Sequence, residues 1–378
     1  MRILIAADLV PTKSNFNLFN NADIEELLGK DLLNIWNGAD IRIFNLEVPI
    51  TDQPNPIKKC GPNLICPTST IKGIRALNPN LITLANNHIL DQGEEGLEST
   101  IDILNRNNIQ YIGAGKNIEE LRKNIIIKKN GLKLGIYNCA EREFSIATKY
   151  NSGANPFDPL EILDEISELK KSCDYLVVIY HGGKEHYRYP SPDLQKSCRK
   201  LVEKGADLIV CQHSHCIGCF EDYNNSTIIY GQGNFIFDNS ESEYWQTSLL
   251  VSIDLDNKIS INYYPITKKG NVIRLANGKT ESKILEDFKS RSNEILDEKF
   301  IERKYNEFSK DNINTYIKAF SGMSKCILRI DKYVFRSNFL RKRFTKQKLL
   351  AIKNFIECQA HRELVVNGIN CIIEEGEK

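Results

Sequence analysis

Residues 205–220 read GADLIVCQHSHCIGCF, and the interpretation of the whole chain depends on this stretch. The apolar run over 207–211 predicts a buried β-strand, and two histidines, His213 and His215, follow it directly. Three cysteines in the same stretch also suggest a structural zinc site. Such a site needs a second ligand pair about 12–20 residues away, whereas the next cysteine is Cys326. The spacing therefore favours chemistry at the histidine pair and packing by the cysteines.

Short β-branched runs alternate with amphipathic helical patterns over the first two-thirds of the chain. The runs that predict strands are 2–7, 41–46, 81–85, 109–114, 133–139, 175–180 and 207–211. The helical patterns are 23–36, 93–108, 158–172 and 191–205. Strands separated by helices predict a layered α/β domain over residues 1–270, which ends in two hairpins around Asn224-Asn225 and Asp256-Asn257.

Residues 280–378 have a different character, because they are helical in pattern and rich in charge. Within them, 325–348 holds nine Lys and Arg residues and a single acid. Lys325, Arg329, Lys332 and Arg336 would form one stripe of a helix, with Ile327, Ile330 and Val334 on another. Two interpretations stay open: a solvated helix packed on the first domain, or a basic amphipathic helix that contacts an anionic membrane or an acidic partner.

Polar and ionisable residues gather just past the ends of the predicted strands. Five strand ends deliver carboxylates, an amide and imidazoles, namely Asp8, Glu47, Asn87, His88, His181, His213 and His215. A single strand-end histidine or aspartate is usually a loop residue or a turn former. Here four of the six histidines follow strands, and the carboxyl ends of strands in layered α/β folds face a common crevice. Oxygen and imidazole donors at one edge predict a site for Zn²⁺, Mn²⁺ or Fe²⁺.

The composition limits the location and the partners that we expect. The net charge is +1, so no general attraction to nucleic acid or membrane follows, and no nucleic-acid motif accompanies the basic segment. The N-terminus lacks the pattern of a signal peptide, and no run of 18 apolar residues occurs. Eleven scattered cysteines fit reduced thiols. These features predict a cytoplasmic protein, with peripheral contact at the inner membrane face left open.

Six blocks in order resemble the CapA family of bacterial capsule and poly-γ-glutamate synthesis proteins. The blocks are NLEVPIT (45–51), LANNHILDQGEEGLEST (84–100), YIGAGKNIEEL (111–121), YHGGKEHYRYPSP (180–192), GADLIVCQHSH (205–215) and YGQGNFIFD (230–238). This resemblance covers about residues 1–270. It implies the calcineurin-like metallophosphoesterase fold, a four-layer αββα sandwich with a metal centre at the strand ends.

The resemblance also implies roles for individual residues. Glu47 would bridge two ions, and His88 would protonate the leaving group or steady the transition state. Asp91 and Glu185 would support the site from outside the ligand set. The implied metal ligands are Asp8, Glu47, Asn87, His181, His213 and His215, holding one or two divalent ions (Mn, Fe or Zn).

The chain departs from the family pattern in three places. Ala7 precedes the aspartate where the family has glycine. Val10 stands where phosphoesterases proper carry a histidine, an absence that the family shares. Gly182 replaces a common tryptophan, and CQHSH replaces GHHPH. With fewer imidazoles available, occupancy by a single ion becomes an alternative.

Two functions follow as expectations from the residues and the resemblance. The first is a metal-dependent hydrolase of the phosphoesterase type, acting on an anionic small molecule or polymer in envelope polymer synthesis. The second is a non-catalytic accessory subunit of an envelope polymer system, working with other synthesis proteins and carrying a weakened metal site.

Overall fold

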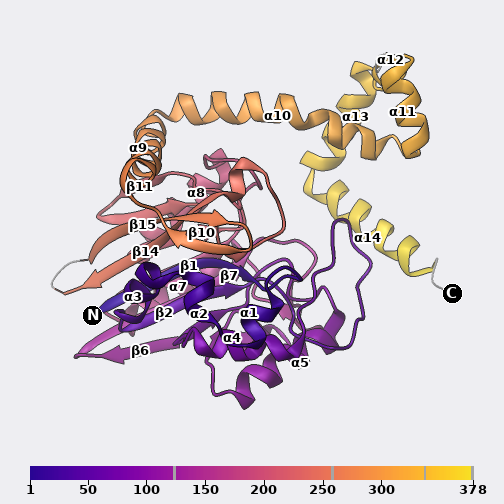
Figure 1. The fold of residues 1–378 in the computed structure, drawn as a ribbon. Helices are drawn as coiled ribbons and strands as arrows, with labels where there is room; N and C mark the ends of the chain where they lie inside the picture. The colour runs from indigo at the N-terminus through magenta and orange to yellow at the C-terminus, as the bar shows by residue number, and fades with distance from the viewer. Residues whose placement is uncertain (122–124, 257–258, 336–337, 376–378) are drawn as a thin grey trace. The chain divides into compact units, whose positions relative to one another are not determined.

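The computed structural model describes residues 1–121, 125–256, 259–335 and 338–375, drawn in Figure 1. The chain divides into two compact units, Met1–Glu302 and Arg303–Lys378. The first unit extends past residue 270, where the sequence predicts the α/β domain to end. The extension includes helix α9 (Gly278–Glu294), whose Phe288 ring packs 5.2 Å from Phe220 and 5.0 Å from Tyr263 between ring centroids.

One mixed sheet contains the N-terminal strand. Over the described residues its order is β16-β15-β14-β1-β2-β3-β4, and β13 also pairs with β1. Its strands are β1 (Arg2–Val10), β2 (Ile41–Leu46), β3 (Leu81–Thr83), β4 (Tyr111–Ile112), β13 (Asn234–Phe237), β14 (Thr247–Leu255), β15 (Ile259–Lys269) and β16 (Val272–Leu275). Strand β1 changes partner along its length, from antiparallel β14 at Arg2–Ile5 to parallel β13 at Asp8–Val10. Asp8 therefore lies between β2 and β13.

The second sheet has the order β11-β12-β10-β9-β7-β6. Its strands are β6 (Ile125–Lys129), β7 (Leu132–Ala140), β9 (Tyr175–His181), β10 (Leu208–Gln212), β11 (Phe220–Tyr223) and β12 (Ser226–Tyr230). Strands β7, β9, β10 and β12 are parallel, so their carboxyl ends lie at one edge. A further small sheet pairs β5 (Ala114–Gly115) with β8 (Gly153–Ala154).

The predicted hairpins are present as antiparallel pairs. Strands β11 and β12 are joined by Asn224-Asn225, and both residues have the positive φ that a tight turn of this kind requires. Strands β14 and β15 also pair antiparallel, although Asn257 of their predicted turn lies outside the described residues. The sequence patterns missed β6, which pairs antiparallel with β7.

Helices cover the outer faces of the two sheets. Those of the first unit, besides α9, are α1 (Phe16–Asn20), α2 (Ile24–Leu28), α3 (Lys30–Asn37), α4 (Ile71–Ala76), α5 (Gly93–Arg106), α6 (Ile118–Leu121), α7 (Ile162–Lys171) and α8 (Pro192–Glu203). The single helix predicted over 23–36 is wrong, because Gly29 adopts φ +72° and divides it into α2 and α3. Helix α8 begins as predicted, with the Ser191 side chain accepting a hydrogen bond from Leu194 N.

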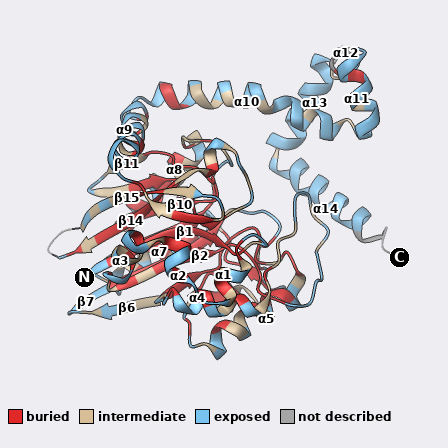
Figure 2. Cartoon of the chain, in the orientation of Figure 1, coloured by how far each residue is buried: buried red, intermediate tan, exposed pale blue. Residues whose placement is uncertain are grey.

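The four-layer αββα sandwich is confirmed by the alternation of side chains along the strands. Ile5 of β1 and Ile179 of β9 belong to the core between the two sheets. Leu4 faces outward into a core formed with α1–α5, and Val178 faces outward into a core formed with α7 and α8. Each sheet is therefore buried on both faces, as Figure 2 shows by the red strands at the centre of this unit.

The second unit is helical, as predicted for the C-terminal region. Its helices are α10 (Glu298–Phe320), which starts in the first unit, α11 (Lys325–Tyr333), α12 (Asn338–Arg343), α13 (Lys346–Glu357) and α14 (Gln359–Glu375). Of the predicted basic stripe, Lys325, Arg329 and Lys332 lie on α11, which ends at Tyr333, and Arg336 lies outside the described residues. Among the described helices, none combines the length and the apolar character that crossing a bilayer requires.

Candidate metal centre

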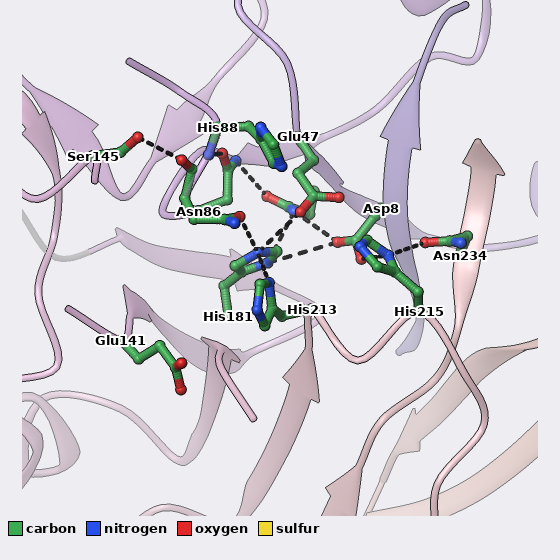
Figure 3. A network of polar contacts seen from close by, with 12 residues as sticks. Asp8, Glu47, Asn86, His88, Glu141, Ser145, His181, His213, His215 and Asn234 are labelled. Carbon is green, nitrogen blue, oxygen red and sulfur yellow. Dashed lines mark hydrogen bonds and ion pairs between the residues drawn. The ribbon is translucent and has the colours of Figure 1, made fainter. Parts of the chain in front are cut away.

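Strand register brings the predicted site residues together. Asp8 on β1 lies opposite Asn45 on β2 and Asn234 on β13, in three neighbouring parallel strands. In the other sheet, His181 at the end of β9 lies opposite Gln212, the residue before His213. The carboxyl ends of both sheets therefore deliver donors to one buried place, shown in Figure 3.

The tightest part of the site surrounds one ring nitrogen. His181 Nε2 lies 3.1 Å from Glu47 Oε1, 3.1 Å from Asn87 Oδ1 and 3.1 Å from His213 Nδ1. These side chains are all buried. A ring nitrogen carries at most one hydrogen, so it cannot donate to three acceptors at once. Without a cation, several of these lone pairs would repel one another at contact distance.

The donor set fits a divalent metal ion. Ligands 2.0–2.1 Å from a tetrahedral zinc ion lie about 3.3 Å from one another, close to the separations around His181. Both oxygens of Glu47 and Oδ2 of Asp8 are buried without a hydrogen-bond partner among the described residues. Buried carboxylate oxygens are costly unless they are paired with a cation or a donor. Carboxylate, amide and imidazole donors together suit Zn²⁺, Mn²⁺ or Fe²⁺.

A second group of donors shares Glu47 with the first. Glu47, His181 and His213 form one group, and Asp8, Glu47 and His215 form the other, each with ligand atoms within 4.8 Å of one another. The second group is looser, since His215 Nδ1 lies 3.9 Å from Asp8 Oδ2 and 2.8 Å from Asn234 Oδ1. A carboxylate common to two groups is the arrangement that a pair of ions requires.

Burial and the charges of neighbouring groups shift the pKa values of the clustered side chains. Burial and the Glu47 carboxylate raise the pKa of Asp8 to about 6. Burial alone would lower the pKa of His181, but Glu47 outweighs it and holds that pKa above its usual range. Burial likewise opposes ionisation of Glu47, yet His181 keeps the pKa of that carboxyl below its usual range. Burial with His181 and His215 nearby holds the pKa of His213 well below its usual range. A proton on His181 thus supplies the positive charge that a bound cation would otherwise supply to the neighbouring carboxylates.

The backbone that carries the histidine pair is strained. His213 has φ +80° and His215 has φ +53°, in a region that residues other than glycine rarely adopt. Such a conformation costs roughly 1–2 kcal/mol per residue. The surrounding structure holds both residues in this conformation. Strained residues of this kind are common at functional sites.

A chain of asparagines fixes the ligands, and the sequence patterns missed it. Asn45 Nδ2 donates to Asp8 Oδ1 at 2.7 Å, and Asn86 Nδ2 donates to Asn45 Oδ1 at 3.1 Å. Asn86 Oδ1 accepts from His88 N, and Ser145 Oγ donates to the carbonyl oxygen of Asn87. Asn45 and Asn86 are direct neighbours of predicted motif residues, which is the signal that could have identified them.

His88 lies beside Glu47 (Figure 3), but it belongs to a different polar group. Its Nδ1 lies 2.6 Å from Asp91 Oδ2, so that the ring donates from Nδ1. Asp91 also pairs with Lys59, whose side chain is only 2% exposed although the surrounding loop is open to solvent. Lys59 Nζ lies 3.3 Å from His88 Nδ1 as well. Nothing in the sequence spacing indicates that Lys59, rather than the neighbouring Lys58, pairs with Asp91.

The remaining expected residues have different fates. Asp91 Oδ2 lies 2.6 Å from His88 Nδ1, whereas Glu185, the other acid expected to support the site, is exposed. Glu141, which the sequence patterns missed, accepts a hydrogen bond from Gly183 N at 3.0 Å and is held by burial at a raised pKa. Among the described residues no cysteine belongs to a metal-binding group, and Cys211, Cys216 and Cys219 are buried free thiols, in keeping with their predicted packing role.

Gly182 has a steric reason for replacing a larger residue. A Cβ at this position would lie 2.7 Å from the Tyr180 ring and 3.0 Å from Glu141 Oε2. The side chains that surround it therefore occupy the space a tryptophan would need.

Comparisons with known proteins place residues 4–239 within the sequence pattern of the bacterial capsule synthesis protein PGA_cap. The PGA biosynthesis protein CapA of Bacillus subtilis is 32% identical over 210 residues, covering 54% of this chain and 55% of that protein. The capsule biosynthesis protein CapA of Bacillus anthracis is 30% identical over 203 residues, covering 52% and 49%. A probable polyglutamine synthesis accessory protein of Mycobacterium tuberculosis is 26% identical over 224 residues, covering 56% and 59%. The match thus spans about half the length of these curated relatives.

Among solved structures, the 5′-nucleotidase precursor of Thermus thermophilus is 13% identical with a TM-score of 0.40, covering 76% of this chain and 58% of that one.

Replacement of His213 by alanine is expected to weaken metal binding by more than about 100-fold. Loss of a residue that only supports a ligand already lowers metal affinity by about 10–100-fold in such sites, and loss of a ligand should cost more. His215→Ala should weaken binding less if only the tighter position is filled. Metal content after dialysis against a limiting chelator measures the effect. His361→Ala, on an exposed part of α14, is the matched control. Full metal stoichiometry in the His213 and His215 variants, both still folded by circular dichroism, would contradict the assignment.

Metal affinity is expected to fall as the pH drops through about 7 to 5. Asp8, with a pKa of about 6, gains a proton in this window, and both Asp8 and His181, whose pKa is raised, must lose their protons to bind an ion. Each such proton changes the apparent Kd by about tenfold per pH unit below its pKa. Calorimetric titration of chelator-treated protein in buffers of different ionisation enthalpy would count the protons released. A Kd that stays constant from pH 7 to pH 5 would argue against these ligands.

Lys59→Met is expected to destabilise the fold by about 3–5 kcal/mol, because it leaves Asp91 buried without its cation. The double variant Lys59→Met/Asp91→Asn should lose less than the sum of the single variants. The exposed pair Arg106–Asp102 serves as the control, with an expected loss below about 0.5 kcal/mol for Arg106→Met. Urea unfolding of the unchanged protein, Lys59→Met, Asp91→Asn, the double variant and Arg106→Met gives the comparison. Equal, small losses for Lys59→Met and Arg106→Met would show that the buried pair does not matter.

Proposed function

The chain belongs to the bacterial capsule synthesis protein family PGA_cap, and from this premise we propose that it is a metal-dependent hydrolase of phosphoester-like substrates in envelope polymer synthesis. The observation that carries the proposal is the group of donors 3.1 Å from His181 Nε2, beside buried carboxylate oxygens that lack hydrogen bonds. A divalent cation would satisfy these groups more completely than a proton shared among them.

The proposed ligands are the six residues expected from the sequence, with Glu47 shared between two positions. The tighter position uses Glu47, Asn87, His181 and His213, and the looser one uses Asp8, Glu47 and His215. A divalent ion bound there supplies Lewis acidity and a nucleophile at neutral pH. The network of Asn45 and Asn86 keeps the ligands oriented, which reduces the reorganisation that the reaction would otherwise require.

His88 is the proposed general acid. Asp91 accepts the hydrogen of its Nδ1, so that Nε2 is left to carry the proton that is given to the departing oxygen. The Asp91 carboxylate holds the ring in place and is itself paired with Lys59. His88 therefore acts on the substrate, whereas Asp91 and Lys59 position it.

A cavity of about 750 Å³ is the proposed place for the body of the substrate. Three of its lining residues connect it to the site. Val10 follows Asp8 by two positions, the Phe237 ring lies 5.8 Å from the His215 ring between centroids, and Leu64 N donates to Asp91 Oδ2. Its walls mix apolar with hydroxyl and charged groups, as for a substrate with an apolar or sugar part next to its anionic group.

A second candidate is an accessory subunit that binds a metal, or the anionic groups of a polymer, without turnover. Two observations favour it. The second ligand group is loose, with Val10 where phosphoesterases proper carry a histidine, and one relative is described as an accessory protein. In this alternative the partners are other proteins of an envelope polymer system.

Turnover of generic phosphodiester, phosphomonoester and amide substrates by the metal-loaded protein distinguishes the two candidates. We expect His88→Ala to keep its metal and to lose about 10²–10⁴-fold in kcat, the usual contribution of a general acid. His361→Ala should match the unchanged protein. Full metal content without turnover on any substrate class would favour the accessory role, and an unchanged rate in His88→Ala would remove His88 from the mechanism.

A further inference from the structure

The two units carry opposite charge. Residues 303–378 contain sixteen Lys and Arg against eight Asp and Glu, a net charge of +8. Because the whole chain has a net charge of +1, residues 1–302 have a net charge of −7. A charge asymmetry of this size between parts of one chain suggests that the basic part meets an anionic partner.

The second unit also exposes large apolar side chains. Figure 2 shows α11, α13 and α14 mostly in the colour of exposed residues. The exposed apolar residues around α11 and α12 are Ile327, Ile330, Tyr333, Val334, Phe335 and Phe339. Isolated exposed apolar residues are normal on a protein surface, but six within 13 residues of the sequence mark an interaction surface.

Helix α11 sorts its apolar and basic residues onto different faces. Ile327, Ile330 and Val334 recur at helical spacing and are 46%, 53% and 66% exposed. Lys325, Arg329 and Lys332 lie about half a turn away, and none of the three forms an ion pair with a described residue. We name these six residues, five on α11 and Val334 at its C-terminal cap, the docking face.

The one acid of this segment does not offset the docking face. Asp331 is buried and accepts hydrogen bonds from Phe339 N and Leu340 N, which ties α11 to α12. The Asp331 carboxylate therefore interacts with backbone groups within the pair of helices α11 and α12. Further basic residues follow on exposed positions, namely Lys342, Arg343, Lys346 and Lys348.

We propose that the docking face binds the surface of an anionic lipid membrane. An amphipathic helix with an apolar face and a Lys/Arg-rich polar face lies in the boundary between headgroups and acyl chains. Each basic residue near an anionic bilayer strengthens binding about fivefold, and the apolar residues supply the remainder by burial. Pairing of the docking faces of two copies of this chain is disfavoured, because both faces carry the same positive charge.

Binding of the full-length protein to vesicles tests the proposal. Cosedimentation with an equal mixture of phosphatidylcholine and phosphatidylglycerol should exceed that with phosphatidylcholine alone, and should fall with added salt. Lys325→Gln/Arg329→Gln/Lys332→Gln should weaken binding by about a hundredfold. Ile327→Ser/Ile330→Ser/Val334→Ser should weaken it at least about tenfold, since the exposed side chains contribute to membrane burial and not to the core.

The control removes the same charge elsewhere. Lys30→Gln/Lys72→Gln/Lys196→Gln changes three exposed lysines of the first unit and should bind vesicles like the unchanged protein. Equal binding to both vesicle types, equal loss in the control, or no vesicle binding together with dimers in sedimentation would each overturn the proposal. Metal content is measured in parallel, and it should be the same in all three variants, so a failure here is distinct from a failure of the metal centre.

Discussion

The structure depends on one electrostatic constraint. Two buried carboxylates and three buried imidazoles lie so close together that their charges and lone pairs would repel one another unless positive charge is held among them. Around His181 Nε2 the partners lie at 3.1 Å, and two carboxylates have oxygens without hydrogen bonds. In the absence of an ion, a proton held by His181 reduces the cost, as the raised pKa of that residue indicates. A divalent cation would satisfy the same groups more completely, and binding it would release that proton.

The constraint arises because strands of both sheets end at the same place in the fold. Strand β1 leaves β14 and takes β13 as its partner where Asp8 begins the crevice, so neighbouring asparagines on β2 and β13 can hold the ligands. Strands β9 and β10 of the other sheet end at the same place, and the strained backbone of His213 and His215 turns their rings toward the first sheet. Tight packing between the sheets keeps these ends in register.

Much of this arrangement could be predicted from the sequence, for identifiable reasons. Strand ends that carry Asp8, His181 and the His-x-His pair are visible because hydrophobic runs stop abruptly before polar residues. The break of the predicted helix at Gly29 was missed because the apolar spacing continues through it, although its φ is positive. Lys59 was missed because its partner Asp91 is distant in sequence and only the folded loop buries the pair.

The metal centre is tested most directly by the position of the ion itself. A crystal structure of the metal-loaded protein, with anomalous scattering recorded above and below the absorption edge of the bound metal, would locate it. We predict an anomalous peak within bonding distance of Glu47, Asn87, His181 and His213, with any second peak sharing Glu47. A metal-loaded crystal with no peak at these residues, or with its peak elsewhere in the chain, would contradict the account.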